Sequence, residues 1–134
     1  MPVHRVSPET PAYNCIAWAA EEDFRWWWPD PIGTHYWPEG VKREETLDAF
    51  IELFRIRGYE VTESSVLEPG YVKIAIFCDS QNKPTHAARQ ASSGLWTSKL
   101  GSSYDVEHDL HDPNICAAPC AYGRVAVVMR RRVV

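Results

Sequence analysis

The clearest hydrophobic pattern in the chain lies between residues 44 and 58. Leu47, Phe50, Ile51 and Phe54 recur at spacings of three and four residues, which places their side chains on one face of a helix. The charged residues of this stretch fall between them: Glu44, Glu45, Glu52, Arg55 and Arg57. Gly58 follows and suits the end of a helix. The pattern predicts an amphipathic helix that ends at Gly58.

An earlier helix is expected after an irregular arm that covers residues 1–12. Asn14 is a favourable N-cap residue, and the alanine-rich stretch after it predicts a helix that runs toward Arg25. Pro29 and Pro31 end this helix. Residues 29–42 contain three prolines and two glycines, so they are expected to form a long, aromatic-rich loop.

The second half of the chain has the shorter period of β-strands. Strands are predicted at residues 59–62, 71–78, 85–91, 95–100 and 123–131, with a hairpin turn at 92–94 and a loop over 101–120. The order predicts an α+β fold in which two N-terminal helices pack on one face of an antiparallel sheet of about four to five strands. The length of 134 residues fits a single domain, 1–134.

Composition and charge narrow the function classes. The net charge is −4, and the one basic cluster is Arg130, Arg131 and Arg132, so no nucleic-acid partner is expected. No apolar run approaches the roughly 20 residues that span a bilayer, and the N-terminus lacks the apolar core of a secretory signal, so no membrane partner is expected. The four cysteines do not form a disulfide pattern. The chain is therefore expected to be cytoplasmic, with reduced thiols.

Cys15 and His86 are the strongest candidates for chemistry. Cys15 follows the predicted cap Asn14, and the free N–H groups and partial positive charge of a helix start favour a thiolate. The Cys15 N–H, with the Asn14 or Tyr13 side chain, could also stabilise an oxyanion. His86 begins a predicted strand, from which its imidazole could act as the base.

A third catalytic group would accept a hydrogen bond from the far side of that imidazole. Asp105, which follows the predicted hairpin, is the first choice. Glu107, His108 and Asp109 lie close enough in the sequence to remain alternatives. A Cys15–His86–Asp105 site would support acyl transfer to water, with a peptide, a protein or an amide-containing small molecule as substrate.

This order of Cys, His and acid resembles the papain-like and transglutaminase-like thiol hydrolases. The blocks NCIAWAA, WWWP, YWPEGV, THAARQ and WTSKLG together resemble an uncharacterised bacterial domain family over nearly the whole length. The resemblance implies a papain-like core and a peptidase, amidase or deamidase activity.

An aromatic cluster supplies a different hypothesis. Trp18, Trp26, Trp27, Trp28 and Trp37 are candidate substrate-binding residues, together with Asn14, because indoles could line a groove beside Cys15. Consecutive helical residues point about 100° apart, so three adjacent indoles cannot all face one core. The alternative is a non-catalytic binding module that uses residues 26–37 to hold a partner.

A third hypothesis is a small zinc-binding protein. His108, His111, Cys116 and Cys120 are a usable set of nitrogen and sulfur ligands, although their spacing matches no common zinc finger. No glycine-rich phosphate loop, HExxH motif or serine elbow is present in the sequence, and no cofactor is expected. The oligomeric state is not predicted by the sequence.

Overall fold

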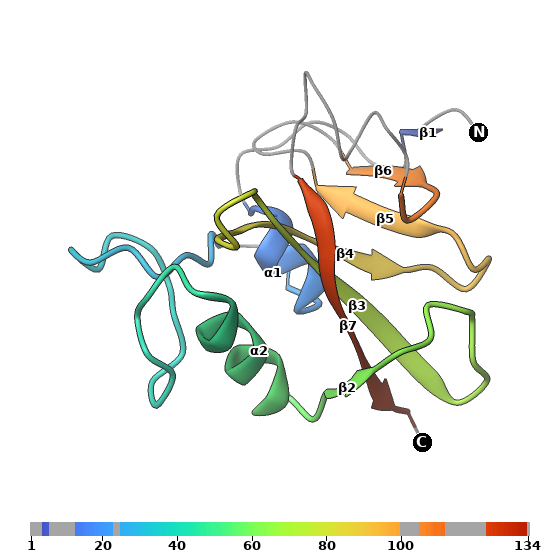
Figure 1. Ribbon diagram of the computed structural model, residues 1–134, viewed down its shortest axis with the longest axis horizontal. Helices are drawn as coiled ribbons and strands as arrows, with labels where there is room; N and C mark the ends of the chain where they lie inside the picture. The colour runs from blue at the N-terminus through green and yellow to red at the C-terminus, as the bar shows by residue number, and fades with distance from the viewer. Residues whose placement is uncertain (1–3, 6–12, 23–24, 100–104, 112–122, 134) are drawn as a thin grey trace.

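The computed structural model describes residues 4–5, 13–22, 25–99, 105–111 and 123–133. Within these residues, seven strands form one sheet in the order β1-β6-β5-β4-β3-β7-β2, and each neighbouring pair is antiparallel (Figure 1). The strands are β1 (His4–Arg5), β2 (Glu60–Thr62), β3 (Tyr71–Cys78), β4 (Pro84–Gln90), β5 (Trp96–Lys99), β6 (Asp105–His108) and β7 (Arg124–Arg132). The helices of the same residues are α1 (Cys15–Ala19) and α2 (Leu47–Arg55).

The predicted fold class is therefore wrong. The sequence predicted two N-terminal helices on a sheet of about four to five strands with a papain-like core, but the sheet dominates and both helices are short. Two of the seven strands, β1 and β6, pair with each other at one side of the sheet. The sequence predicted an arm and a loop at these positions. Both strands were missed because two to four residues are too few to display an alternating pattern.

The central part of the sheet is buried on both faces. Along β3, Ile74 and Ile76 join the hydrophobic cluster that contains α1 and α2, whereas Ala75 and Phe77 join a second cluster on the opposite face. This arrangement follows from the period of two in a strand, which sends successive side chains to opposite faces. It also explains why the sequence of β3 is almost continuously apolar rather than alternating.

Helix α2 agrees with its prediction. Thr46 caps it by accepting a hydrogen bond from the N–H of Ala49 at 3.2 Å, and Ala49, Phe50, Leu53 and Phe54 are buried. Gly58 adopts a φ of 93° just beyond the helix, in the left-handed region that glycine tolerates. No helix of the described residues is long and apolar enough to cross a membrane.

Helix α1 is shorter than predicted. Asn14 caps it as expected, but the helix ends at Ala19 rather than near Arg25. Glu21 has a φ of 67°, which turns the chain out of the helical path. The turn allows the backbone of Trp27 to reach the side chain of Asn14, so a tertiary contact overrides the helical preference of the alanines.

The strands predicted at 59–62, 71–78, 85–91, 95–100 and 123–131 are confirmed as β2, β3, β4, β5 and β7, with small shifts at their ends. The loop predicted over 101–120 is wrong where β6 forms, and residues 101–104 and 112–120 lie outside the described residues. Helix α1 packs on β4 and β5, which places the start of α1 against the middle of the sheet (Figure 1).

Gly123 and Gly70 offer a matched test of the packing around β7. Both have positive φ values, +90° and +82°, so alanine at either position adopts a left-handed backbone at a cost of about 1–2 kcal/mol. A Cβ on Gly123 would lie 2.0 Å from the carbonyl oxygen of Cys78, whereas a Cβ on Gly70 would meet nothing within 4 Å. We expect Gly123→Ala to cost about 3 kcal/mol or more and Gly70→Ala about 1 kcal/mol, measured by denaturant unfolding. Equal losses for the two variants would contradict this packing.

Candidate functional site

Cys15 lies at the first position of α1 and is 7% exposed. Burial raises the pKa of its thiol to about 11, although hydrogen bonds from the backbone of Ala87, Ile16 and Cys15 and the charge of Lys99 act in the opposite direction. The predicted activation by the helix start is thus smaller than the cost of removing a thiolate from water. At neutral pH, Cys15 is a protonated thiol.

The structure does not bring Cys15 and His86 together. Cys15 packs with Ala87 in the cluster on the helical face of the sheet. His86 precedes Ala87 on β4, and its ring packs edge-on against Phe77, with 5.3 Å between the ring centroids, in the cluster on the other face. Because neighbouring strand residues point to opposite faces, β4 itself stands between the thiol and the imidazole.

His86 belongs instead to a buried chain of polar groups that joins three strands. Its Nε2 lies 2.8 Å from Oγ of Ser98 on β5, and that oxygen lies 2.6 Å from Nε2 of His108 on β6. All three residues are buried, and Nδ1 of His108 lies 2.6 Å from the carbonyl oxygen of Asp109. The chain therefore stabilises the packing of β4, β5 and β6 on the face opposite α1.

The carbonyl of Asp109 fixes the direction of these hydrogen bonds. A carbonyl only accepts, so we assign the proton of a neutral His108 to Nδ1, which leaves its Nε2 to accept from the Ser98 hydroxyl. The Ser98 oxygen then accepts from Nε2–H of His86. The resulting pair, a serine hydroxyl that donates to an imidazole held by a carbonyl, has the polarity of a hydrolase site, but both side chains are buried.

The four candidates for the third catalytic residue lie in different environments. His108 is joined to His86 through Ser98, whereas Asp109 is exposed and contributes only its carbonyl oxygen. Glu107 alternates with His108 and points to the other face of β6. Asp105 pairs through its backbone with Lys99, and its side chain lies outside the described residues.

Ser98 was missed by the sequence analysis. The register of β5 with β6 places it opposite Val106, and that pairing becomes visible only when β6 is recognised as a strand. Two of the four ligands in the zinc hypothesis, Cys116 and Cys120, lie outside the described residues. Among the residues that are described, no group of three or more His, Cys, Asp or Glu side chains could hold a metal ion.

The side-chain amide of Asn14, predicted to stabilise an oxyanion, is hydrogen-bonded to the backbone of Ala17 and Trp27. Its Oδ1 accepts from the N–H of Ala17 at 3.2 Å and of Trp27 at 3.0 Å, while its Nδ2 donates to the carbonyl of Trp27 at 2.8 Å. One amide thus caps α1 and fixes the Trp27 backbone. Trp27 in turn forms a bridge with Tyr36, flanked by hydrogen bonds between Trp28 N–H and Tyr36 O and between Tyr36 N–H and Trp26 O.

Most indoles of the predicted aromatic cluster belong to the hydrophobic core or pack against it. Trp27 and Trp37 are buried, and their indole N–H groups donate to Glu22 at 2.7 Å and to the Lys42 carbonyl at 2.9 Å. Trp28 packs edge-on against Phe50. Trp18 donates to Thr97 at 3.0 Å and lies under the guanidinium of Arg89. Trp26, which is partly buried, stacks on His35.

The 29–36 loop leads from the Trp27 side of this β-bridge to the Tyr36 side. Asp30 and Arg43 hold the backbone of the loop. The Asp30 carboxylate accepts from the N–H groups of Thr34 at 2.7 Å and His35 at 3.0 Å. Nη1 of Arg43 lies within 3.4 Å of the Asp30, His35 and Trp28 carbonyls. Burial alone would raise the pKa of Asp30, but hydrogen bonds from Thr34 and His35 outweigh it and lower that pKa.

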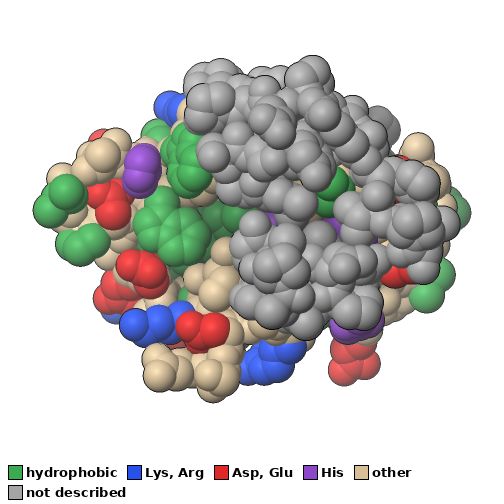
Figure 2. Space-filling model, turned by 90° about the horizontal axis from the view of Figure 1, so that it is seen from above, with side chains coloured by type: hydrophobic (Ala, Val, Ile, Leu, Met, Phe, Trp, Pro, Cys, Tyr) green, Lys and Arg blue, Asp and Glu red, His purple; other side chains and the backbone are tan. Residues whose placement is uncertain are grey.

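Ile32 occupies the tip of this fixed loop and is 87% exposed, the highest value among the large hydrophobic residues of the described chain. The loop projects at one end of the long axis of the molecule (Figure 1). Figure 2 shows hydrophobic side chains at that end, beyond the acidic and histidine side chains. The loop was predicted to be irregular, and the link between Asp30 and Arg43 gave no recognisable local motif in the sequence.

These features define a chain with a seven-stranded antiparallel sheet, a buried polar chain on one face and a rigid projecting loop. Residues 4–130 match the family model for a domain of unknown function, DUF7689, and the chain belongs to this family. No curated protein and no solved structure matches the chain.

The thiol of Cys15 is expected to react slowly. With a pKa of about 11, about one thiol in a thousand is ionised at pH 8. We expect iodoacetamide to modify Cys15 far more slowly than a free cysteine, and no faster than buried Cys78, measured by peptide mass spectrometry. His86→Gln is expected to leave the rate unchanged. Rapid alkylation of Cys15 that His86→Gln slows would instead support the thiol-hydrolase hypothesis.

Burial of His86 is expected to make folding stability depend on pH. Desolvation, followed by the charge of His108, lowers the pKa of His86 from 6.5 to about 3. The unfolded chain therefore binds a proton below pH 6.5 that the folded chain excludes, so stability falls as the pH drops from 6.5 toward 3. We expect His86→Gln to flatten this part of the profile of unfolding free energy against pH. His111→Gln, which removes an exposed histidine, is the matched control, and equal profiles for both variants would contradict the assignment.

Proposed function

We propose that this chain is a non-catalytic binding module that presents the 29–36 loop to a partner protein. The observation that carries the proposal is the contrast between the tip and the base of the loop. Ile32 is 87% exposed, while Asp30 and Arg43 hold the backbone on both sides of it. Such a loop offers a hydrophobic anchor in a fixed position.

The physical advantage of this arrangement is preorganisation. A mobile loop loses conformational entropy when it binds, and this cost reduces affinity. Hydrogen bonds to the Asp30 carboxylate and from Arg43 have already removed much of that freedom in the free protein. A single protruding apolar side chain is also the type of group that fills a pocket at the centre of an interface. A complementary partner surface is therefore a small apolar pocket on a protein.

Two features weigh against the thiol-hydrolase hypothesis. The Cys15 thiol has a raised pKa, and His86 packs with Phe77 on the other side of β4. Two of the indoles proposed to bind substrate, Trp27 and Trp37, are buried in the core, and the most exposed large hydrophobic side chain within residues 26–37 is Ile32. We also propose a cytoplasmic location, which the free thiols of Cys15 and Cys78 support.

Ile32→Asp tests the binding role. We expect this variant to fold with unchanged stability, because Ile32 is exposed, and to lose the partner that immobilised wild-type protein retains from a lysate of the source organism. Quantitative mass spectrometry of the retained proteins measures this loss. Asp30→Ala should weaken retention while Ile32 is still present, and should speed amide exchange at Thr34 and His35.

Ile56→Asp is the matched control, because Ile56 is 53% exposed and lies at the end of α2, away from the loop. This variant should retain the same proteins as the wild type. If Ile32→Asp and wild-type protein retain identical sets, the loop does not bind a protein and the proposal fails.

A further inference from the structure

We propose that the partner of the 29–36 loop is a second copy of this chain, whose cavity between β3 and β4 receives Ile32. This inference rests on the proposed binding function and adds the identity of the partner. The cavity has a volume of about 390 Å³ and lies where the β2–β3 connection crosses the ends of β3 and β4. Its apolar lining comes from Leu67, Pro69, Tyr71, Val72 and Ala91.

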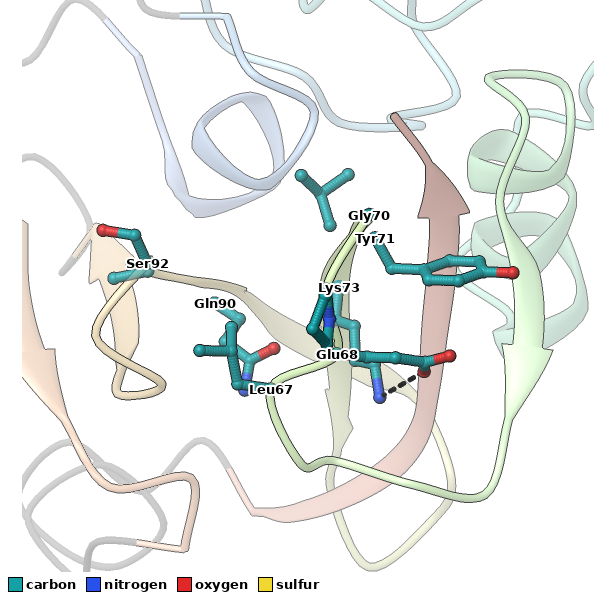
Figure 3. Close-up of a pocket in the computed structure, with 10 residues that line it drawn as sticks. Leu67, Glu68, Gly70, Tyr71, Lys73, Gln90 and Ser92 are labelled. Carbon is teal, nitrogen blue, oxygen red and sulfur yellow. Dashed lines mark ion pairs between the residues drawn. The ribbon is translucent and has the colours of Figure 1, made fainter. Parts of the chain in front are cut away.

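The cavity is built by two polar side chains that anchor the β2–β3 connection, buried Lys73 and half-buried Gln90. Nζ of Lys73, which is 1% exposed, donates to the carbonyls of Ser64 and Val66 at 2.8 Å and pairs with Glu68 at 3.2 Å. Nε2 of Gln90 donates to the carbonyl of Ser65 at 2.9 Å. In Figure 3, the pair of Lys73 and Glu68 lies between Leu67 and Gln90 on one side and Tyr71 on the other. The cavity is therefore preformed, like the loop.

The charges of the two surfaces are compatible. Residues 31–34 of the loop carry no charge, and the carboxylate of Glu68 in the cavity is already neutralised by Lys73 and Arg130. Contact would thus bury no unpaired charge, which would be costly. The flanks are complementary. Arg132 is exposed, and its backbone pairs with that of Tyr71 beside the cavity. The segment after the loop has an acidic excess, because it exposes one lysine, Lys42, and four acidic residues: Glu39, Glu44, Glu45 and Asp48.

The positions of the two surfaces determine the kind of assembly. The 29–36 loop lies at one end of the long axis, and the β2–β3 and β4–β5 connections lie at the other end (Figure 1). A chain therefore cannot fill its own cavity, and each copy has one tip and one cavity to offer. Such contacts join copies head-to-tail into rows or rings, or join two copies reciprocally, with each tip in the other copy's cavity. A tip this small buries less than a standard interface, so the association is weak.

Sedimentation velocity over a concentration series that reaches the millimolar range tests this proposal. We expect the wild type to shift from monomer to larger species as concentration rises. Ile32→Asp removes the tip, Leu67→Asp places a carboxylate beside Glu68 in the cavity, and Ser92→Trp fills the cavity from an exposed position. Each variant alone should remain a monomer at all concentrations, while the Ile56→Asp control should associate as the wild type does.

The sharper arm mixes two variants that cannot self-associate. Ile32→Asp keeps its cavity and Leu67→Asp keeps its tip, so an equal mixture should form a one-to-one heterodimer and nothing larger. A wild type that stays monomeric, or a mixture that forms no heterodimer, overturns the proposal. If retention from a lysate still depends on Ile32 in that case, the binding function stands with a different partner. If that retention is also independent of Ile32, both proposals fail.

Discussion

The arrangement of the described N-terminal half depends on the hydrogen bonds of the Asn14 side-chain amide. A single buried carboxamide satisfies a free N–H at the start of α1 and pairs with both backbone polar groups of Trp27. These groups would otherwise be buried without partners, at a cost of about 1–3 kcal/mol each. Because Trp27 also pairs with Tyr36, the same amide sets the base from which the 29–36 loop projects. A residue that the sequence suggested for catalysis thus has an architectural role.

The burial of both sheet faces explains why the predicted site does not assemble. A buried strand presents alternate residues to two separate cores, so a shift of one residue decides which core a side chain enters. Ala87 packs beside Cys15, and His86, one position earlier, packs with Phe77, Ser98 and His108. The sequence indicates that a histidine lies on a strand but not which face its side chain occupies. That choice depends on the register with β3 and β5.

Local signals were sufficient where one element carried its own pattern. The period of α2 and the strands β3, β4, β5 and β7 were predictable, because each depends on residues near in sequence. Three features depend on distant partners and were not predictable. Helix α1 stops early to let Trp27 reach Asn14, β6 forms by pairing between β1 and β5, and Arg43 reaches back 13 residues to the Asp30 carbonyl.

The exposed Ile32 has a physical explanation in the interactions beneath it. An isoleucine on a mobile loop can move toward the surface and cover part of its apolar area. Hydrogen bonds to Asp30 and from Arg43 prevent that movement. They therefore keep the apolar side chain of Ile32 exposed to water, at an unfavourable hydration free energy. The same logic applies to the cavity, which Lys73 and Gln90 keep open by anchoring the connection above it. Polar contacts therefore maintain both surfaces in the free protein. Association of the tip with the cavity would be favourable, because it removes apolar area from water without reordering either backbone.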